Sequence, residues 1–211
     1  MGLLTVNYCN LLFSSVILVE MTKDDIISLP NDHLRQRSKK VGVVSDAVRK
    51  LAEDMQAATL DWEDSREHEV GVALAGVQVD ELTRIVVIRQ DFDDKTNRNF
   101  NVFINPEITK FEGEINEDFE GCLSIPDVYG KVPRYSKVRV RALNLQGKQV
   151  RIKAEGFLAR VFQHEIDHTN GKVFIDHIKD KPEAYFRLEA DGSLTPLDYE
   201  KNIANNAALW E

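Results

Sequence analysis

The sequence predicts an α+β fold in which antiparallel strands pack around a helix in the C-terminal half of the chain. Three observations support this class: an early helical pattern, several strand patterns separated by turns, and a late helical pattern that ends at a glycine. The 211 residues, 43% of them hydrophobic and 29% charged, suffice for one domain with a hydrophobic core. No repeat or linker divides residues 21–211, which we predict to form a single catalytic domain.

The first helix is predicted over residues 45–62. Leu51, Met55 and Ala58 recur at helical spacing, and Ser45 stands before them as a candidate N-cap residue. Strand patterns follow: residues 84–89 and 102–104 are apolar runs separated by a polar loop. The second of these runs ends two residues before a proline, Pro106.

A hairpin and a second helix are predicted next. Residues 137–143 alternate charged and apolar side chains, and a turn at residues 146–147 leads to a partner strand at 150–152. The helix should begin near Glu155 and end at Gly171, which can cap its C-terminus. Helical spacing puts four side chains on one face, with Glu165 beside them: Phe157, Val161, His164 and His168.

Neither end of the chain has a clear assignment. We read residues 1–20 as an N-terminal extension or an added cloning segment, with Met21 as the natural start and a genuine N-terminal strand as the alternative. The apolar run at 11–19 is too short to span a bilayer, and no basic residue precedes Lys23 as a signal peptide would require. The acidic tail after Asp180 is only weakly periodic.

Charge and cysteine content restrict the partners and the compartment. The formal charge of −8 argues against a protein that neutralises nucleic-acid phosphates over its whole surface, although it leaves room for a local basic patch. We therefore predict no DNA and no membrane partner. Cys9 and Cys122 are the only cysteines, so the sequence favours a cytoplasmic protein without a disulfide framework.

The strongest local motif is HEIDH at residues 164–168. Two histidines four residues apart on a helix can bind one metal ion, and the glutamate beside the first can reach a water on that metal. A third protein ligand is needed, and the sequence offers alternatives. No third histidine follows Gly171 at the spacing of metzincins, so a later carboxylate, Glu183 or Glu189, or the thiolate of Cys122 remains. A lone cysteine is more often a small buried hydrophobic residue.

Three motifs in order decide between these alternatives. GVALAGVQ at residues 71–78, EGCLS at 120–124 and HEIDHTNG at 164–171 together make the chain resemble the peptide deformylases, whose signatures are GxGLAAxQ, EGCLS and HEIDHxxG. The resemblance extends from about Met21 to Asp180. It implies removal of the formyl group from the N-terminal formylmethionine of nascent polypeptides, with release of formate and transient contact with the ribosome.

The resemblance also implies roles for individual residues. Cys122, His164 and His168 match the ligands of one divalent metal ion, with Fe²⁺ expected and Zn²⁺, Ni²⁺ or Co²⁺ as substitutes. Glu165 matches the general base and acid that acts on the water held by the metal, and Gln78 and the backbone N–H of Leu123 match the groups that stabilise the oxyanion. The predicted substrate-binding residues are Val72, Ala73, Gly121, Phe157, Arg160 and Val161.

The first motif departs from the family pattern at Ala73, where the family has glycine, and at Gly76, where it has alanine. The added methyl group at Ala73 is expected to narrow the substrate cleft. Glu120 and Arg134 match residues that pair in the family, whereas the acidic cluster at 112–120 is typical of a solvated face. We expect the remaining histidines to be surface or structural residues: His33, His68 and His177.

Two alternative functions compete with deformylation. One is a small zinc endopeptidase that uses Glu183 or Glu189 as its third ligand, in which Cys122 would be dispensable. The other is a non-catalytic protein of the same fold that binds peptide N-termini, which the two departures at Ala73 and Gly76 suggest. Formate release from a formyl-methionyl peptide separates both from a deformylase.

Overall fold

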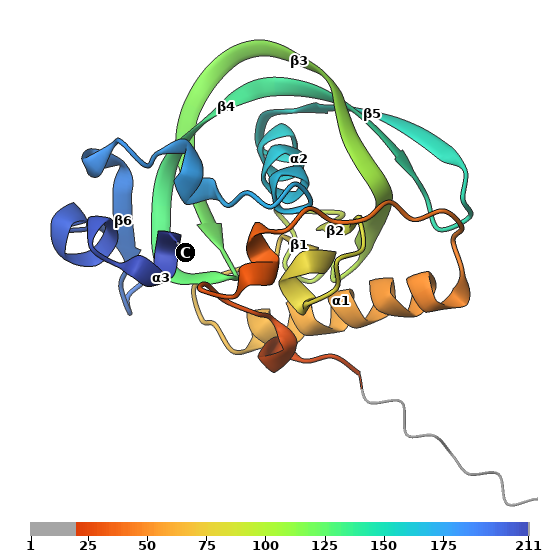
Figure 1. The fold of residues 1–211 in the computed structure, drawn as a ribbon, viewed down its shortest axis with the longest axis horizontal. Helices are drawn as coiled ribbons and strands as arrows, with labels where there is room; N and C mark the ends of the chain where they lie inside the picture. The colour runs from red at the N-terminus through yellow and green to blue at the C-terminus, as the bar shows by residue number, and fades with distance from the viewer. Residues whose placement is uncertain (1–19, 211) are drawn as a thin grey trace, which may run out of the picture.

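The computed structural model describes residues 20–210 and places a seven-stranded antiparallel sheet around one long helix of the C-terminal half (Figure 1). The strand order is β1-β2-β3-β4-β6-β7, and β5 pairs with β4 off this path. The predicted α+β class is therefore confirmed. The strands are β1 (Ala73–Ala75), β2 (Ile85–Arg89), β3 (Phe100–Cys122), β4 (Ile125–Leu143), β5 (Gln149–Glu155), β6 (Tyr185–Leu188) and β7 (Leu194–Pro196).

The first predicted helix is α1 (Asp46–Asp64), which begins where the sequence analysis expected and ends two residues later than predicted. The Ser45 hydroxyl accepts a hydrogen bond from the N–H of Val48 and so satisfies one of the free donors of the first turn. Met55 and Ala58 are fully buried, and they pack in one cluster with residues of β1 and β2. This face fixes α1 against the sheet edge that leads to the site.

β3 and β4 form one long hairpin that arches over the second helix (Figure 1). Of β3, the sequence predicts only residues 102–104, because Pro106 indicates a strand boundary. The strand instead continues through Pro106, where the pairing with β4 shifts register between Ile104 and Glu107. A bulge at this point removes the need for the N–H that proline lacks. The acidic cluster of residues 112–120 runs along this strand and is largely exposed, except that Glu120 is buried.

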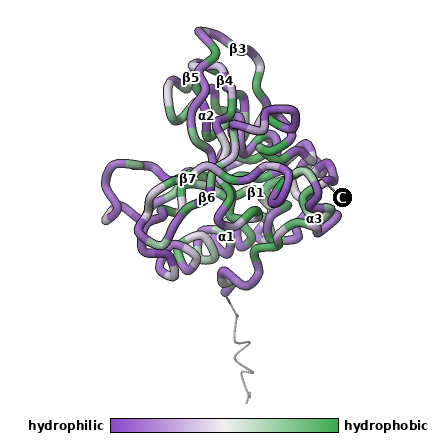
Figure 2. Tube along the Cα trace, turned by 90° about the vertical axis from the view of Figure 1, so that its left-hand side faces the viewer, coloured by the Kyte–Doolittle hydropathy of each residue, from purple (hydrophilic) through white to green (hydrophobic). Residues whose placement is uncertain are grey.

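The second helix, α2 (Gly156–His168), lies beneath the arch, as Figures 1 and 2 both show. Phe162 is fully buried in a cluster that includes Val86 and Val138, so the helix packs against both β2 and β4. Burial of a side chain of this size contributes about 1.5–3 kcal/mol. The helix ends three residues before Gly171, whose φ of 75° and N–H bond to the His168 carbonyl terminate it as the glycine predicted.

The predicted hairpin 137–143 to 150–152 is confirmed as β4 and β5, although both strands are longer than expected. Its turn is held by Asn144, whose side-chain oxygen accepts hydrogen bonds from the N–H groups of Gln146 and Lys148. Gly147 has a φ of 72°, which only glycine adopts without strain. The pairing brings Lys137 opposite Glu155, directly before α2.

The tail forms structure that its weak periodicity did not predict. β6 pairs with β4 near Gly130, β7 pairs with β6, and Tyr185 and Ile203 are buried against the last turns. The remaining elements are α3 (Ala207–Trp210), a π-helical turn (Glu200–Ala204) and short 3-10 turns at Lys23–Asp25, Asp32–Arg35, Gly76–Val79, Phe174–His177 and Pro182–Ala184. Within residues 20–210 no helix is long and apolar enough to cross a membrane. The interpretation of the N-terminal extension concerns residues outside this range.

Candidate metal centre and substrate cleft

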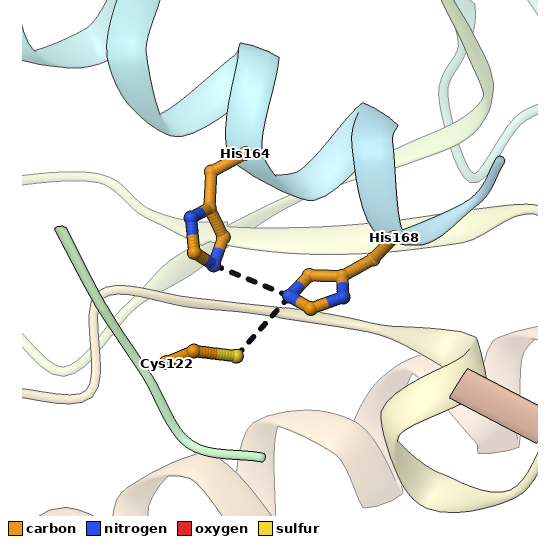
Figure 3. A group of neighbouring side chains, drawn as sticks. All are labelled: Cys122, His164 and His168. Atoms are coloured by element: carbon orange, nitrogen blue, oxygen red, sulfur yellow. Dashed lines mark hydrogen bonds between the residues drawn. The ribbon is translucent and has the colours of Figure 1, made fainter. Parts of the chain in front are cut away.

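Three side chains that can bind a metal ion converge at the start of the β3–β4 turn (Figure 3). Cys122 is the last residue of β3, and His164 and His168 lie one turn apart on α2. The His168 Nε2 atom lies 3.3 Å from the Cys122 Sγ atom and 3.2 Å from the His164 Nε2 atom. All three ligand atoms lie within 4.8 Å of one another. In the part of the chain that the structure describes this is the only such group, and neither Glu183 nor Glu189 belongs to it.

A buried carboxylate orients the first histidine. Glu120 is two residues before Cys122 on β3, and its Oε2 atom lies 3.0 Å from the Nδ1 atom of His164. Arg134 donates to both carboxylate oxygens at 2.9 and 3.0 Å, and Arg160 donates to Oε1 at 2.7 Å. Burial would raise the pKa of Glu120, but the hydrogen bonds and charges of His164 and Arg134 hold it well below its usual range. An ionised Glu120 keeps a proton on Nδ1 of His164 and leaves its Nε2 lone pair free for a metal.

The same network extends to the end of α2. Arg134 also donates to the carboxylate of Asp167, which His177 contacts at 2.7 Å. The predicted pairing of Glu120 with Arg134 is thus confirmed. Neither His33, which contacts Asp80, nor His177 belongs to the metal-binding group, as the sequence analysis expected.

Gln78 lies beside the thiol with its amide in a fixed orientation. Its Oε1 atom accepts a hydrogen bond of 2.9 Å from the N–H of Ala75, so its NH₂ group must point the other way. Nε2 then lies 3.2 Å from the Ser124 hydroxyl and 3.5 Å from the Cys122 sulfur. The short 3-10 turn that follows β1 therefore presents an N–H donor to the centre.

Glu165 is almost completely buried, and its Oε2 atom has no hydrogen-bond partner among the described residues. Burial raises the pKa of Glu165 to about 7. A carboxylate whose pKa lies near neutrality can both accept and donate a proton at physiological pH. The residue therefore has the burial and the protonation equilibrium that proton transfer requires.

A cleft of about 210 Å³ opens onto these groups. Every predicted catalytic and substrate-binding residue lines it, although the guanidinium of Arg160 is directed into hydrogen bonds with Glu120 and two backbone carbonyls. Five further residues line the cleft that no sequence motif marks: Trp62, Glu69, Val70, Phe119 and Tyr129. The Tyr129 hydroxyl donates to Glu69, and its ring lies so close to Gly121 that a methyl group there would come within 2.7 Å.

Comparison with known protein families decides what this arrangement is. A model of the polypeptide deformylase family matches residues 23–184. The chain belongs to this family. The family assignment made from the three motifs is therefore confirmed, as is the prediction that the chain is a peptide deformylase enzyme.

Individual members of the family agree with this assignment. A peptide deformylase of Mesorhizobium japonicum is 45% identical over 153 residues, which cover 72% of this chain and 82% of the relative. One of Thermomicrobium roseum is 42% identical, with 74% and 86% covered. The crystal structure of a peptide deformylase from Synechococcus elongatus in complex with actinonin superposes with a TM-score of 0.64 at 34% identity and covers 72% of this chain and 76% of that one.

The two departures from the deformylase pattern lie on β1 and in the turn that follows it. Ala73 is buried and lines the cleft, so its methyl group takes up space there. Gly76 has a different environment, because a methyl group there would lie 2.7 Å from the Thr83 carbonyl and 2.9 Å from the Ile85 side chain. The glycine at 76 thus allows close contact between two backbone segments.

The donor set fits the divalent metal on which deformylases depend. Tetrahedral bonds of about 2.0 Å to nitrogen and 2.3 Å to sulfur would separate the ligand atoms by about 3.3–3.6 Å. The observed 3.2 and 3.3 Å are close to this. The Nδ1 proton of His164 points to Glu120, so the lone pair of its Nε2 atom faces the centre. A cation held there would bind this nitrogen together with His168 Nε2 and the Cys122 sulfur as a thiolate.

Proposed function

We propose that the chain removes the formyl group from N-formyl-methionyl peptides with the help of one divalent metal held by Cys122, His164 and His168. The observation that carries this proposal is the convergence of the three ligand atoms in the cleft that Glu165 and Gln78 also line. When bound, the metal supplies Lewis-acid polarisation of the formyl carbonyl and activation of water.

Glu165 is proposed to move the protons. Its unpartnered Oε2 atom accepts a proton from the attacking water and later donates it to the nitrogen of the leaving methionine. The buried position excludes competing solvent and raises the pKa of the carboxyl group to about 7. No other carboxylate that lines the cleft has these properties, because Glu120 is held ionised and Glu69 accepts from Tyr129.

Two N–H donors are proposed to stabilise the developing oxyanion. The Nε2 group of Gln78 is fixed by the bond between its oxygen and Ala75. The backbone N–H of Leu123 follows Cys122 in the β3–β4 turn, on the same wall of the cleft. Fixed donors of this kind stabilise charge without reorganisation during the reaction, and loss of one typically costs ~10²–10³ in kcat.

The methionine and the following residues occupy the rest of the cleft in this proposal. Phe157, Val161 and Leu123 supply apolar side chains, while Val72, Ala73 and Gly121 border the peptide. The substrate is a nascent polypeptide, so we place the activity in the cytoplasm, with transient contact at the ribosome.

The decisive test combines formate release with metal analysis of a Cys122→Ala variant. We expect the wild-type chain to release formate from formyl-Met-Ala-Ser, and the variant to lose both its stoichiometric metal and its turnover. Cys9→Ala, which removes the other cysteine, is the control. A variant that keeps its metal would favour the endopeptidase alternative, and a metal-loaded wild-type chain that releases no formate would contradict the proposed activity.

Replacement of Ala73 by glycine should lower KM for formyl-methionyl peptides with little change in kcat. The methyl group lines the cleft but takes no part in the proton transfers, so its removal should change substrate binding and not the chemical step. Steady-state kinetics measure both constants. Ala75→Gly removes a methyl group from the same strand at a position that does not line the cleft, and it should leave KM unchanged. An equal or higher KM for Ala73→Gly would show that crowding is not the effect of this residue.

We further propose that Fe²⁺ is the native metal. Affinity alone favours Zn²⁺ at a site with two imidazoles and a thiolate. We nevertheless expect anaerobically purified chain to contain iron and to be more active than the zinc-loaded form, and air to inactivate it with oxidation of Cys122. Metal analysis, formate release and mass spectrometry of the Cys122 peptide measure this. Equal activity of both metal forms in air would refute iron and leave the ligand set intact.

A further inference from the structure

The outer face of β4 and β5 carries a concentration of basic side chains in an otherwise acidic chain. In the register of the two strands, Arg141 lies directly opposite Arg151, and Arg139 lies opposite Lys153. All four residues are exposed, and they alternate with buried residues such as Val140 that face α2. Like charges directly opposite one another destabilise a sheet, so this arrangement costs stability in the free protein.

Acidic side chains neutralise only two of these four cations. Arg141 binds Glu107 at 2.9 Å, and Arg139 binds Glu112 at 2.6 and 3.0 Å, both across the β3–β4 pair. On the edge strand β5 the side chains of Arg151 and Lys153 have no hydrogen bond or ion pair with any residue in the range 20–210. Neighbouring cations along a strand lie about 6.8 Å apart, so they form a regular row open to solvent.

One exposed aromatic residue, Tyr135, continues the same face. Tyr135 precedes Lys137 by two residues on β4, so both side chains point outward. Tyr135 is 38% exposed, and its ring contacts the ring of Phe111, which pairs with the buried Val138, at a centroid distance of 5.1 Å. Ile115, opposite Tyr135 on β3, is 57% exposed. Figure 2 shows β3, β4 and β5 together at one end of the molecule.

We propose that this face, the basic sheet face formed by Arg139, Arg141, Arg151, Lys153 and Tyr135, binds a strand of RNA. The cations contact successive phosphates, and the exposed ring offers a platform on which a base stacks. Recognition of this kind is independent of sequence and weakens steeply with salt. The choice of RNA rests on the proposed function, because a chain that acts on nascent polypeptides works beside ribosomal RNA.

The acidic C-terminal tail makes a separate RNA-binding surface there unfavourable. From Glu189 to Glu211 the only basic residue is Lys201. The charge of the basic sheet face complements a polyanion, whereas the charge of the tail does not. It also lies on the opposite side of β4 from α2, so RNA bound there leaves the cleft accessible.

The test measures binding of the metal-loaded full chain to a fluorescein-labelled oligouridine of about 20 nucleotides by fluorescence anisotropy. We expect a Kd on the order of 10⁻⁵ M near 100 mM KCl. The double variant R151E/K153E should bind at least about tenfold more weakly, with a salt slope smaller by about 1.4, the contribution of two phosphates on a single strand. Its Tm should not fall, because each new glutamate lies opposite an arginine.

The matched control is K23E/K201E, which changes the net charge by the same amount at exposed positions away from this face. It should keep wild-type affinity for the RNA, and both double variants should keep wild-type formate release. Equal affinities of R151E/K153E and K23E/K201E for oligouridine would overturn the proposal. Because RNA binding is measured without turnover, a failure of the proposed deformylation would leave this result unaffected.

Two further binding measurements distinguish RNA from other polyanions. Tyr135→Ala should weaken binding to oligouridine and leave binding to inorganic polyphosphate unchanged, since only the former has bases to stack. An unchanged affinity of this variant for oligouridine would contradict the role of the ring. Tighter binding of the wild-type chain to phosphatidylserine vesicles than to oligouridine, lost in R151E/K153E, would overturn the assignment to RNA.

Discussion

Replacing Glu165 by glutamine is expected to reduce kcat for deformylation by about 10²–10⁴-fold, the usual contribution of a positioned general acid–base group. Glutamine keeps the size of the side chain in a site that is almost completely buried, so packing changes little. Its amide cannot accept and return a proton. The three ligand atoms belong to other residues, so the metal content should stay at the wild-type level.

The measurement is formate release at saturating formyl-Met-Ala-Ser, together with metal analysis of the same preparations. Glu183→Gln is the control, because Glu183 is exposed, lies outside the cleft and outside the metal-binding group, and should change neither quantity. Near wild-type turnover by Glu165→Gln would rule out the proton-transfer role. Loss of the metal in this variant would show instead that the carboxylate supports the ligand set.

The largest effect on stability is expected at Glu120. Its carboxylate is buried and is the shared partner of Arg134, Arg160 and His164. Glutamine in its place removes the only carboxylate partner of the buried Arg160 among residues 20–210 and one of the two partners of Arg134, which keeps Asp167. Leaving a buried charge without its partner typically costs about 3–5 kcal/mol in the free energy of unfolding. The substitution also removes the group that fixes the His164 tautomer, and metal affinity should fall by about 10–100-fold.

Urea unfolding of the metal-free chain measures the first effect and metal titration the second. Glu112→Gln, which removes a partly exposed acid from the same strand, should have a much smaller effect on the unfolding free energy. The pKa of Glu120 is lowered on folding, so its stabilising contribution is complete above pH 4.5, its ordinary value, and is lost as the pH falls further. Glu120→Gln should therefore lose less stability on acidification than wild type does. Equal unfolding free energies for the two variants would refute the role of Glu120.

The sequence was most informative where chemistry and periodicity are local. Both long helices follow from apolar spacing with a capping residue, Ser45 before one and Gly171 after the other. The HEIDH motif places His164 and His168 together by helix geometry alone. Cys122 comes from a distant strand, and no local pattern brings a strand end to a helix, so the family resemblance was needed to add it to the histidines.

Features that depend on long-range packing were not predicted in the same way. The extent of β3 depends on pairing with β4, which absorbs Pro106 at a bulge that no local rule locates. Trp62 and Tyr129 line the cleft because α1 and β4 meet there, and neither is marked by a motif. Tyr185 and Ile203 of the tail are buried in one cluster with Val132 and Phe174 of the preceding chain. The spacing of apolar residues within the tail does not reveal this packing.

The close contact at Gly76 constrains how this sequence can change. Glycine at 73 requires no neighbour to move, so the family residue fits there without any other change. Alanine at 76 would collide with the Thr83 backbone, and the turn that precedes β2 would have to be remodelled first. The two departures in one motif therefore differ in the changes they permit: Ala73 can be replaced by glycine alone, whereas alanine at position 76 depends epistatically on a change in the backbone of another segment.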